Sequence, residues 1–141
     1  MTGRFTGSSP TWVKCGCFAG SLDQVAAARA WVRMVLCDYG DDLVADAELC
    51  VSELVTNAVT HTRSTWAGGV VWVRVEFHPD HLRITVRDNG SDEVPTVGGA
   101  GIDAEGGRGL ALVEYLADSF GHRGNYLGRE VWCTFAGTPG A

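Results

Sequence analysis

Apolar residues in the first third of the chain recur with the spacing of an amphipathic helix. We predict a first helix from about Leu22 to Tyr39, with Gly40 ending it. Ser21 and Gln24 have the spacing of a capping box, in which each side chain bonds the backbone N–H of the other residue. The predicted apolar face of this helix consists of Leu22, Val25, Val32 and Leu36.

A second helix is predicted from Asp41 or Asp42, either of which can cap it, to about His61. Its apolar stripe consists of Leu43, Ala47, Cys50, Val51, Leu54 and Ala58. Beside this stripe, Glu53, Asn57 and His61 recur every four residues and form one polar ridge. A carboxylate, an amide and an imidazole on one rigid element suit a divalent ion with a general base. The same spacing is also common on a solvated helix face that has no further role.

Alternation of apolar and polar residues predicts five strands, and a short helical stripe predicts a third helix. The strands are at 11–18, 70–78, 82–88, 119–123 and 130–135, and the helix is at 108–117. This order indicates an α+β fold, a two-layer α/β sandwich with a mixed, mainly antiparallel sheet and the helices on one face. We expect a flexible N-terminus at 1–10, one domain at 11–136 and a tail at 137–141.

Composition narrows the class of protein. The chain has 141 residues and a net charge of −6, which argues against a general nucleic-acid binder with a basic face. Its one lysine, Lys14, does not follow a glycine-rich loop, so the chain has no P-loop. Five scattered cysteines form no disulfide framework and favour a reducing compartment. Without a signal peptide or an apolar run of membrane-spanning length, we expect a cytoplasmic protein with no membrane contact.

The strand predicted at 82–88 ends in a carboxylate. Its alternate residues Leu82, Ile84 and Val86 are apolar, so Asp88 ends the same inward-facing row, and Asn89-Gly90 then turns the chain away. A buried carboxylate needs a partner, and the exocyclic amine of an adenine is one such donor. The alternative is an ordinary turn after a strand, because Asp, Asn and Gly are common in turns.

A glycine-rich segment leads into the third predicted helix, with six glycines from Gly98 to Gly109. The run Gly107-Arg108-Gly109-Leu110 enters the helix, where backbone N–H groups and the helix dipole can bind phosphate, and Arg108 adds a further donor. The segment does not match a Rossmann fingerprint, which requires GxGxxG directly after a strand. The alternative is a flexible loop.

These three segments, in this order, resemble the conserved boxes of the GHKL ATPase superfamily, which includes gyrase and sensor histidine kinases. Residues 53–62 (ELVTNAVTHT) resemble its N box, Asp88-Asn89-Gly90 its first glycine box, and residues 107–110 (GRGL) its second. The compact chain is most similar to the anti-sigma factor serine/threonine kinases, over roughly residues 11–135. One departure is Asp92, which stands where the first glycine box usually has its second glycine.

The resemblance implies binding of ATP and Mg²⁺. It implies that Glu53 is the general base and that Asn57 coordinates Mg²⁺. It further implies that Asp88 binds the adenine amine and that Gly90 lets the base lie close. The remaining residues that it assigns to the nucleotide are Gly107, Arg108, Gly109 and Leu110 near the phosphates, His61 at the end of its box, and Thr134 at adenine.

Three functions follow from the resemblance as expectations. The first is an anti-sigma kinase that phosphorylates Ser or Thr of an antagonist protein of the STAS class and sequesters a sigma factor. The second is an ATP-binding interaction module that transfers no phosphate. The third is a vestigial nucleotide site, because Asp92 can weaken ATP binding. The family's kinases often dimerise, so a homodimer is part of the expectation, whereas direct nucleic-acid binding is not.

Overall fold

The computed structural model describes residues 9–61, 66–90, 104–125 and 127–140, without the side chains of residues 61, 104–109 and 125. Its elements are strands β1 (Trp12–Ala19), β2 (Val70–Phe77), β3 (His81–Asp88), β4 (Ser119–Asn125) and β5 (Gly128–Ala136), a short 3-10 helix η1 (Leu22–Gln24), and helices α1 (Val25–Val35), α2 (Asp41–His61) and α3 (Ala104–Leu116). None of the described helices is long and apolar enough to cross a membrane.

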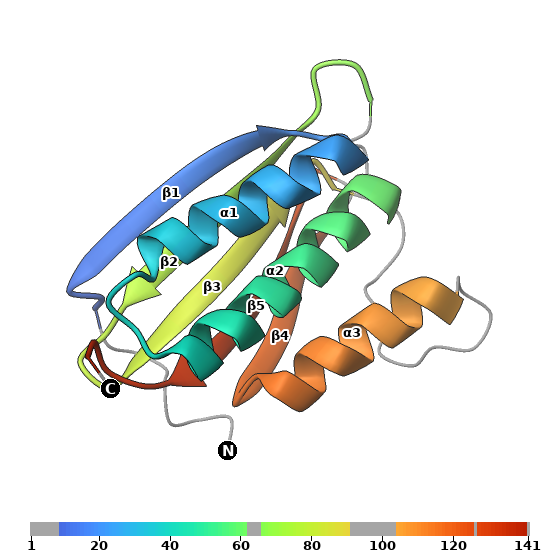
Figure 1. The fold of residues 1–141 in the computed structure, drawn as a ribbon. Coiled ribbons are helices and arrows are strands. Elements are labelled where there is room, and N and C mark those ends of the chain that lie inside the picture. The colour runs from blue at the N-terminus through green and yellow to red at the C-terminus, as the bar shows by residue number, and fades with distance from the viewer. Residues whose placement is uncertain (1–8, 62–65, 91–103, 126, 141) are drawn as a thin grey trace.

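The strands form one sheet in the order β1-β2-β3-β5-β4, and the three α-helices lie on one of its faces (Figure 1). This arrangement confirms the predicted α+β sandwich. The expectation of a mixed sheet was wrong for the described strands, because all four pairings are antiparallel. The connection through α1 and α2 joins the antiparallel neighbours β1 and β2, whereas the connection through α3 crosses from β3 to β4, which run parallel to each other with β5 between them.

The N-terminal helical segment is shorter than predicted. A 3-10 turn precedes α1, which ends at Val35 instead of Tyr39. The capping box does not form: the Ser21 hydroxyl donates to the Asp23 carboxylate, and the backbone N–H of Gln24 donates to the Ser21 carbonyl oxygen at 3.0 Å instead of to that hydroxyl. Val32 and Leu36 are buried as predicted, but Leu22 is exposed because it lies in the 3-10 turn before the packed helix.

Helix α2 has the predicted bounds and lies between α1 and α3 (Figure 1). The stripe predicted for it is buried from Ala47 to Ala58, with Leu43 half-buried at its start. Val55 and Val59 are buried as well, although they lie off that stripe. Because neighbouring helices cover α2 on both sides, its buried arc is wider than the face directed at the sheet.

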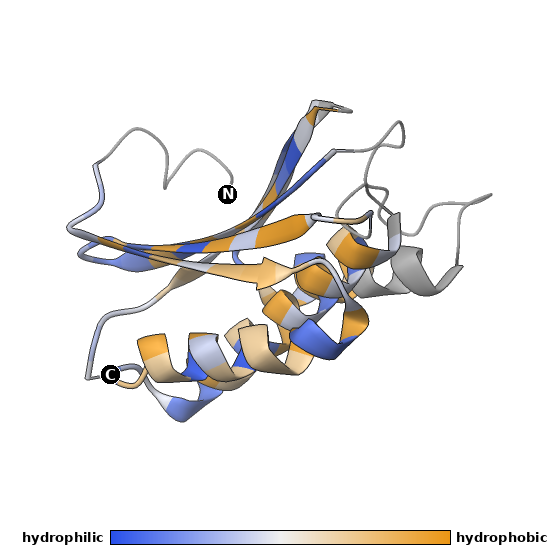
Figure 2. Ribbon diagram, turned by 90° about the horizontal axis from the view of Figure 1, so that it is seen from above, coloured by the Kyte–Doolittle hydropathy of each residue, from blue (hydrophilic) through white to orange (hydrophobic). Residues whose placement is uncertain are grey.

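The hydrophobic core lies between the sheet and the helices, and Figure 2 shows these two layers. Alternate residues of the three central strands point into it, and register places Ile84 of β3 between Val75 of β2 and Cys133 of β5. Asp88 ends the inward row of β3, as predicted, and is buried. The inward residues of these strands are Val71, Val73, Val75, Leu82, Ile84, Val86, Asp88, Arg129, Val131, Cys133 and Phe135.

Candidate nucleotide-binding site

Two of the three predicted motifs meet at one end of the sheet, and the third lies beside them. Strand β3 ends at Asp88, next to the start of β5, and α2 packs against both β3 and α3. The C-terminal end of α2 and the start of α3 lie at this end of the molecule (Figure 1). Asn57 lies on α2, in the helical layer, and Asp88 lies at the end of β3, in the sheet. We call it the Asp88 end of the sheet.

The Asp88 carboxylate is 1% exposed and accepts hydrogen bonds at both oxygens. The backbone N–H of Gly90 donates to Oδ1 at 2.7 Å, and Nε of Arg129, itself 3% exposed, donates to Oδ2 at 3.1 Å. Burial raises the pKa of Asp88, while the positive charge of Arg129 and the hydrogen bond from Gly90 oppose that rise. A buried carboxylate with one hydrogen bond on each oxygen still has free lone pairs to accept further donors.

The raised pKa predicts how pH changes the stability of the empty protein. Folded Asp88 holds its proton more tightly than the unfolded chain, whose value is near 3.8. Stability from this group is therefore lost as the pH rises from the unfolded pKa through the raised folded pKa, and is constant above both. Urea unfolding of the wild type and of Asp88→Asn from about pH 4 to pH 7 measures this, since asparagine does not titrate. The free energy of unfolding of the wild type should increase relative to that of the variant as the pH falls. A relative increase as the pH rises would contradict the raised pKa of Asp88.

The turn after β3 is fixed by local hydrogen bonds and by a glycine. Asn89 Oδ1 accepts from the backbone N–H of Val70 at 2.8 Å, which ties the end of β3 to the start of β2. Gly90 has a φ of +89°, a conformation that side-chain-bearing residues rarely adopt. The glycine of this motif is thus required by the backbone, and it directs its own N–H at Asp88.

The structure describes two of the three side chains in the polar ridge of α2. Asn57 is 7% exposed, and its Nδ2 has no hydrogen-bond partner among the described residues. Glu53 lies one turn earlier and is half-buried, while the side chain of His61 lies outside the described residues. A buried amide with an unused donor is costly unless a ligand satisfies it.

The oxygen ligands of this ridge fit a magnesium ion bound together with phosphates. The amide oxygen of Asn57 is a hard ligand of the kind that Mg²⁺ prefers, and the carboxylate of Glu53 lies one turn away on the same ridge. No group of three or more His, Cys, Asp or Glu that could hold a metal occurs among the described residues. An ion here would therefore take most of its ligands from phosphates and water, as Mg²⁺ usually does.

The second glycine box lies inside a helix and not before one. Helix α3 begins at Ala104, so Gly107, Arg108 and Gly109 lie in its first turns, and the predicted start at Arg108 was wrong. Sequence reasoning treated the glycines as helix breakers, although Ala104 and Glu105 favour helix. The side chain of Leu110 is buried in the core. The side chain of Arg108, the further donor predicted for phosphate, lies outside the described residues, and the predicted phosphate contacts of this segment stay predictions.

The structure does not bring Thr134 to the Asp88 end. Thr134 pairs in register with Arg83, on the face opposite Asp88, and its hydroxyl hydrogen-bonds that of Ser119. Side chains alternate along a strand, so the inward row of β5 is Arg129, Val131, Cys133 and Phe135. Arg129, which sequence reasoning missed, is the β5 residue opposite Asp88. The alternation of the three apolar residues that follow it was the available signal.

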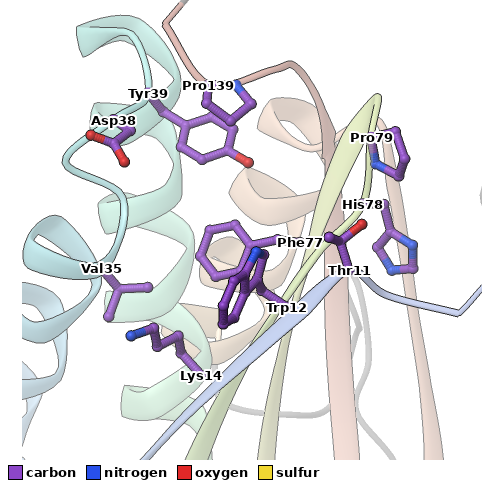
Figure 3. A pocket seen from close by; sticks show the side chains of 10 residues that line it. All are labelled: Thr11, Trp12, Lys14, Val35, Asp38, Tyr39, Phe77, His78, Pro79 and Pro139. Atoms are coloured by element: carbon purple, nitrogen blue, oxygen red, sulfur yellow. The ribbon is translucent and has the colours of Figure 1, made fainter.

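Two hollows lie at the other end of the sheet. One, of about 410 Å³, has an aromatic wall formed by Trp12, Tyr39 and Phe77, with Lys14 and Asp38 at its edge (Figure 3). The second, also about 410 Å³, lies between the start of α2 and the end of β5. Neither is lined by a residue predicted to bind nucleotide.

Comparison with known proteins agrees with this geometry. Residues 18–135 match the family model described as "Histidine kinase-like ATPase domain". The serine-protein kinase RsbW of Bacillus subtilis is 34% identical over 91 residues, and the match covers 57% of this chain and 57% of that relative. A crystal structure of the RsbU and RsbW domains of a Mycobacterium tuberculosis protein superposes with a TM-score of 0.64 at 22% identity, over 92% of this chain and 34% of that one. The chain belongs to the histidine kinase-like ATPase domain family.

Proposed function

We propose that the protein binds ATP with Mg²⁺ and transfers the γ-phosphate to a Ser or Thr hydroxyl of a partner protein. The observation that carries this proposal is the buried Asp88 carboxylate at the end of β3, together with the unpartnered buried amide of Asn57. The similarity to a relative named serine-protein kinase supports the reaction. The chain spans only 57% of the length of that relative, so the activity is inferred from the site.

Each residue of the proposal has one task. Asp88 accepts a hydrogen bond from the exocyclic amine of adenine, and Gly90 leaves room for the base. The amide oxygen of Asn57 coordinates Mg²⁺, which when bound neutralises charge on the phosphates. Glu53, on the same ridge and one turn away, accepts the proton of the attacking hydroxyl. The first turns of α3 and the N-terminal end of its dipole favour the anionic phosphates.

The proposed protein partners are those that the resemblance to anti-sigma factor kinases implies. The phosphate acceptor is an antagonist of the STAS class, and the sequestered protein is a sigma factor. The proposed assembly is a homodimer.

ATP binding is the first step to test. With Mg²⁺ and ATP at a hundredfold excess over Kd, the folded protein should gain about 2.7 kcal/mol, measured by thermal unfolding. Asp88→Asn should lose most of this gain, because an amide presents an N–H where the adenine amine needs an acceptor.

A matched control is available at the other end of the sheet. Asp118 is exposed and accepts a hydrogen bond from the backbone N–H of Ala136 at 2.7 Å, so Asp118→Asn makes the same chemical change at a carboxylate outside the site. This variant should keep the full ATP-dependent gain. Absence of any gain in the wild type at millimolar ATP would refute the proposal.

A further inference from the structure

Arg129 forms a buried, hydrogen-bonded ion pair with Asp88 and has a further buried donor beside it. Its Nε donates to Asp88 Oδ2 at 3.1 Å, and both side chains are almost fully buried. Its Nη2 is also buried and has no hydrogen-bond partner among the described residues. The guanidinium therefore carries a free donor directly beside the carboxylate that it holds.

An unused buried donor is expensive. Leaving such a group without a partner costs about 1–3 kcal/mol, and more when the group is charged. Asparagine on α2 presents the same situation, since Asn57 Nδ2 is also buried without a partner. Two buried donors without acceptors, on the two layers at the Asp88 end, indicate a ligand that brings acceptors to both.

The Asp88–Arg129 pair presents an acceptor and a donor side by side. Asp88 keeps free lone pairs after accepting from Gly90 and Arg129. Arg129 Nη2 offers its N–H groups from the same planar fork that fixes the carboxylate. The complementary edge of a ligand has an N–H next to an acceptor nitrogen, and adenine has this pattern on each side of its exocyclic amine.

We propose that Arg129 is a base-reading residue, which donates from Nη2 to a ring nitrogen of adenine while Asp88 accepts from the adjacent exocyclic amine. The acceptor is N1 or N7, the two ring nitrogens that flank that amine. This inference rests on the proposed function, since it concerns the same nucleotide. It assigns to Arg129 a contact with the ligand in addition to its ion pair with Asp88.

Atom-specific analogues test the contact. Binding of ATP, 1-deaza-ATP and 7-deaza-ATP, each with Mg²⁺, would be measured by calorimetry on the wild type and on Arg129→Lys. In the wild type, loss of the contacted nitrogen should weaken binding roughly ten- to a hundredfold, because a hydrogen bond from a charged donor is lost. The analogue that is affected identifies the nitrogen.

In Arg129→Lys the difference in affinity between ATP and the affected analogue, here called the gap, should shrink to about twofold or less. Lysine has one ammonium nitrogen, which pairs with Asp88, and it has no second arm that could donate to the base. Arg87→Lys is the matched control: Arg87 lies next to Asp88 but faces the opposite side of the sheet, near Glu130 at 3.6 Å. This control should retain the wild-type gap. Arg129→Gln replaces the lysine variant if that variant does not fold, and it should show the same loss of the gap.

The outcomes separate the two proposals. Equal binding of ATP and both analogues by the wild type would overturn the role of Arg129 without any variant and leave ATP binding intact. A gap that persists in the folded Arg129 variants would also overturn it, since another donor must then read the base. Failure of the wild type to bind ATP would overturn the proposed function and this inference together.

Discussion

Replacing Glu53 with glutamine is expected to abolish phosphotransfer while leaving Mg²⁺–ATP binding nearly unchanged. Glutamine keeps the shape of the side chain but cannot accept the proton of an attacking hydroxyl. Loss of a general base typically costs about 10²- to 10⁴-fold in rate. The measurement is transfer of the labelled γ-phosphate to a purified STAS-type antagonist, with thermal stabilisation by ATP as the parallel measure of binding.

Glu48 provides the control on the same helix. Its carboxylate forms an ion pair with Arg33 at 2.6 Å, away from the polar ridge, so Glu48→Gln removes a charge without touching the site. This variant should transfer phosphate at the wild-type rate, since exposed ion pairs contribute little to stability. Full activity of Glu53→Gln would assign the base elsewhere. If the wild type binds ATP but phosphorylates no antagonist, the interaction module without phosphotransfer becomes the better function.

Replacing Leu54 with alanine should give the largest loss of stability. Leu54 is 1% exposed and lies on α2, between the sheet and the flanking helices. Removing a buried leucine side chain costs about 2–5 kcal/mol, from lost apolar burial and the cavity that remains. That cost is a large share of the roughly 5–15 kcal/mol that holds a domain folded. The measurement is the urea midpoint at unchanged slope.

Leu49 lies on the same helix and is 46% exposed, so Leu49→Ala makes the same chemical change outside the core. Its expected cost is well under half that of Leu54→Ala, because little packing is lost. Equal losses from both variants would contradict the position of α2 at the centre of the core. Residual ATP-dependent stabilisation in Leu54→Ala would show that the loss acts on the fold and not on the neighbouring Glu53.

Sequence patterns predicted which helices and strands form more reliably than the residues at which they begin and end. Alternation located the hairpin of β2 and β3, because one face of each strand is buried. The predicted stripe omitted Val55 and Val59, although they follow Val51 at intervals of four residues, and both are buried because neighbouring helices widen the buried arc of α2. It also predicted the capping box at Ser21, where the N–H of Gln24 donates to the Ser21 carbonyl oxygen and the Ser21 hydroxyl donates to the Asp23 carboxylate. Which of several local hydrogen-bond partners a group takes is decided by geometry that spacing alone does not contain.

The sequence also indicated some residues of the candidate site and misplaced or missed others. Asp88 and Asn57 were singled out because each lies next to an apolar pattern that fixes its direction, and both are buried; their binding roles stay predictions. Thr134 was assigned from resemblance, and strand alternation places it on the opposite face. Arg129 was missed because its partner lies 41 positions away, and pairing between distant strands cannot be read from either strand alone. The predicted roles of His61 and of Gly107–Gly109 remain predictions.

The position of Arg129 in the chain has a consequence for folding. Strand β3 forms its hairpin with β2 locally, but it pairs on its other side with β5, after α3 and β4 have been synthesised. Closing that long loop is entropically costly and slows the pairing. Until β5 docks, Asp88 ends a bare sheet edge without its cation. A chain still emerging from the ribosome therefore has the polar ridge of α2 and Asp88 but no completed site, so a ligand of this site can favour only the finished fold.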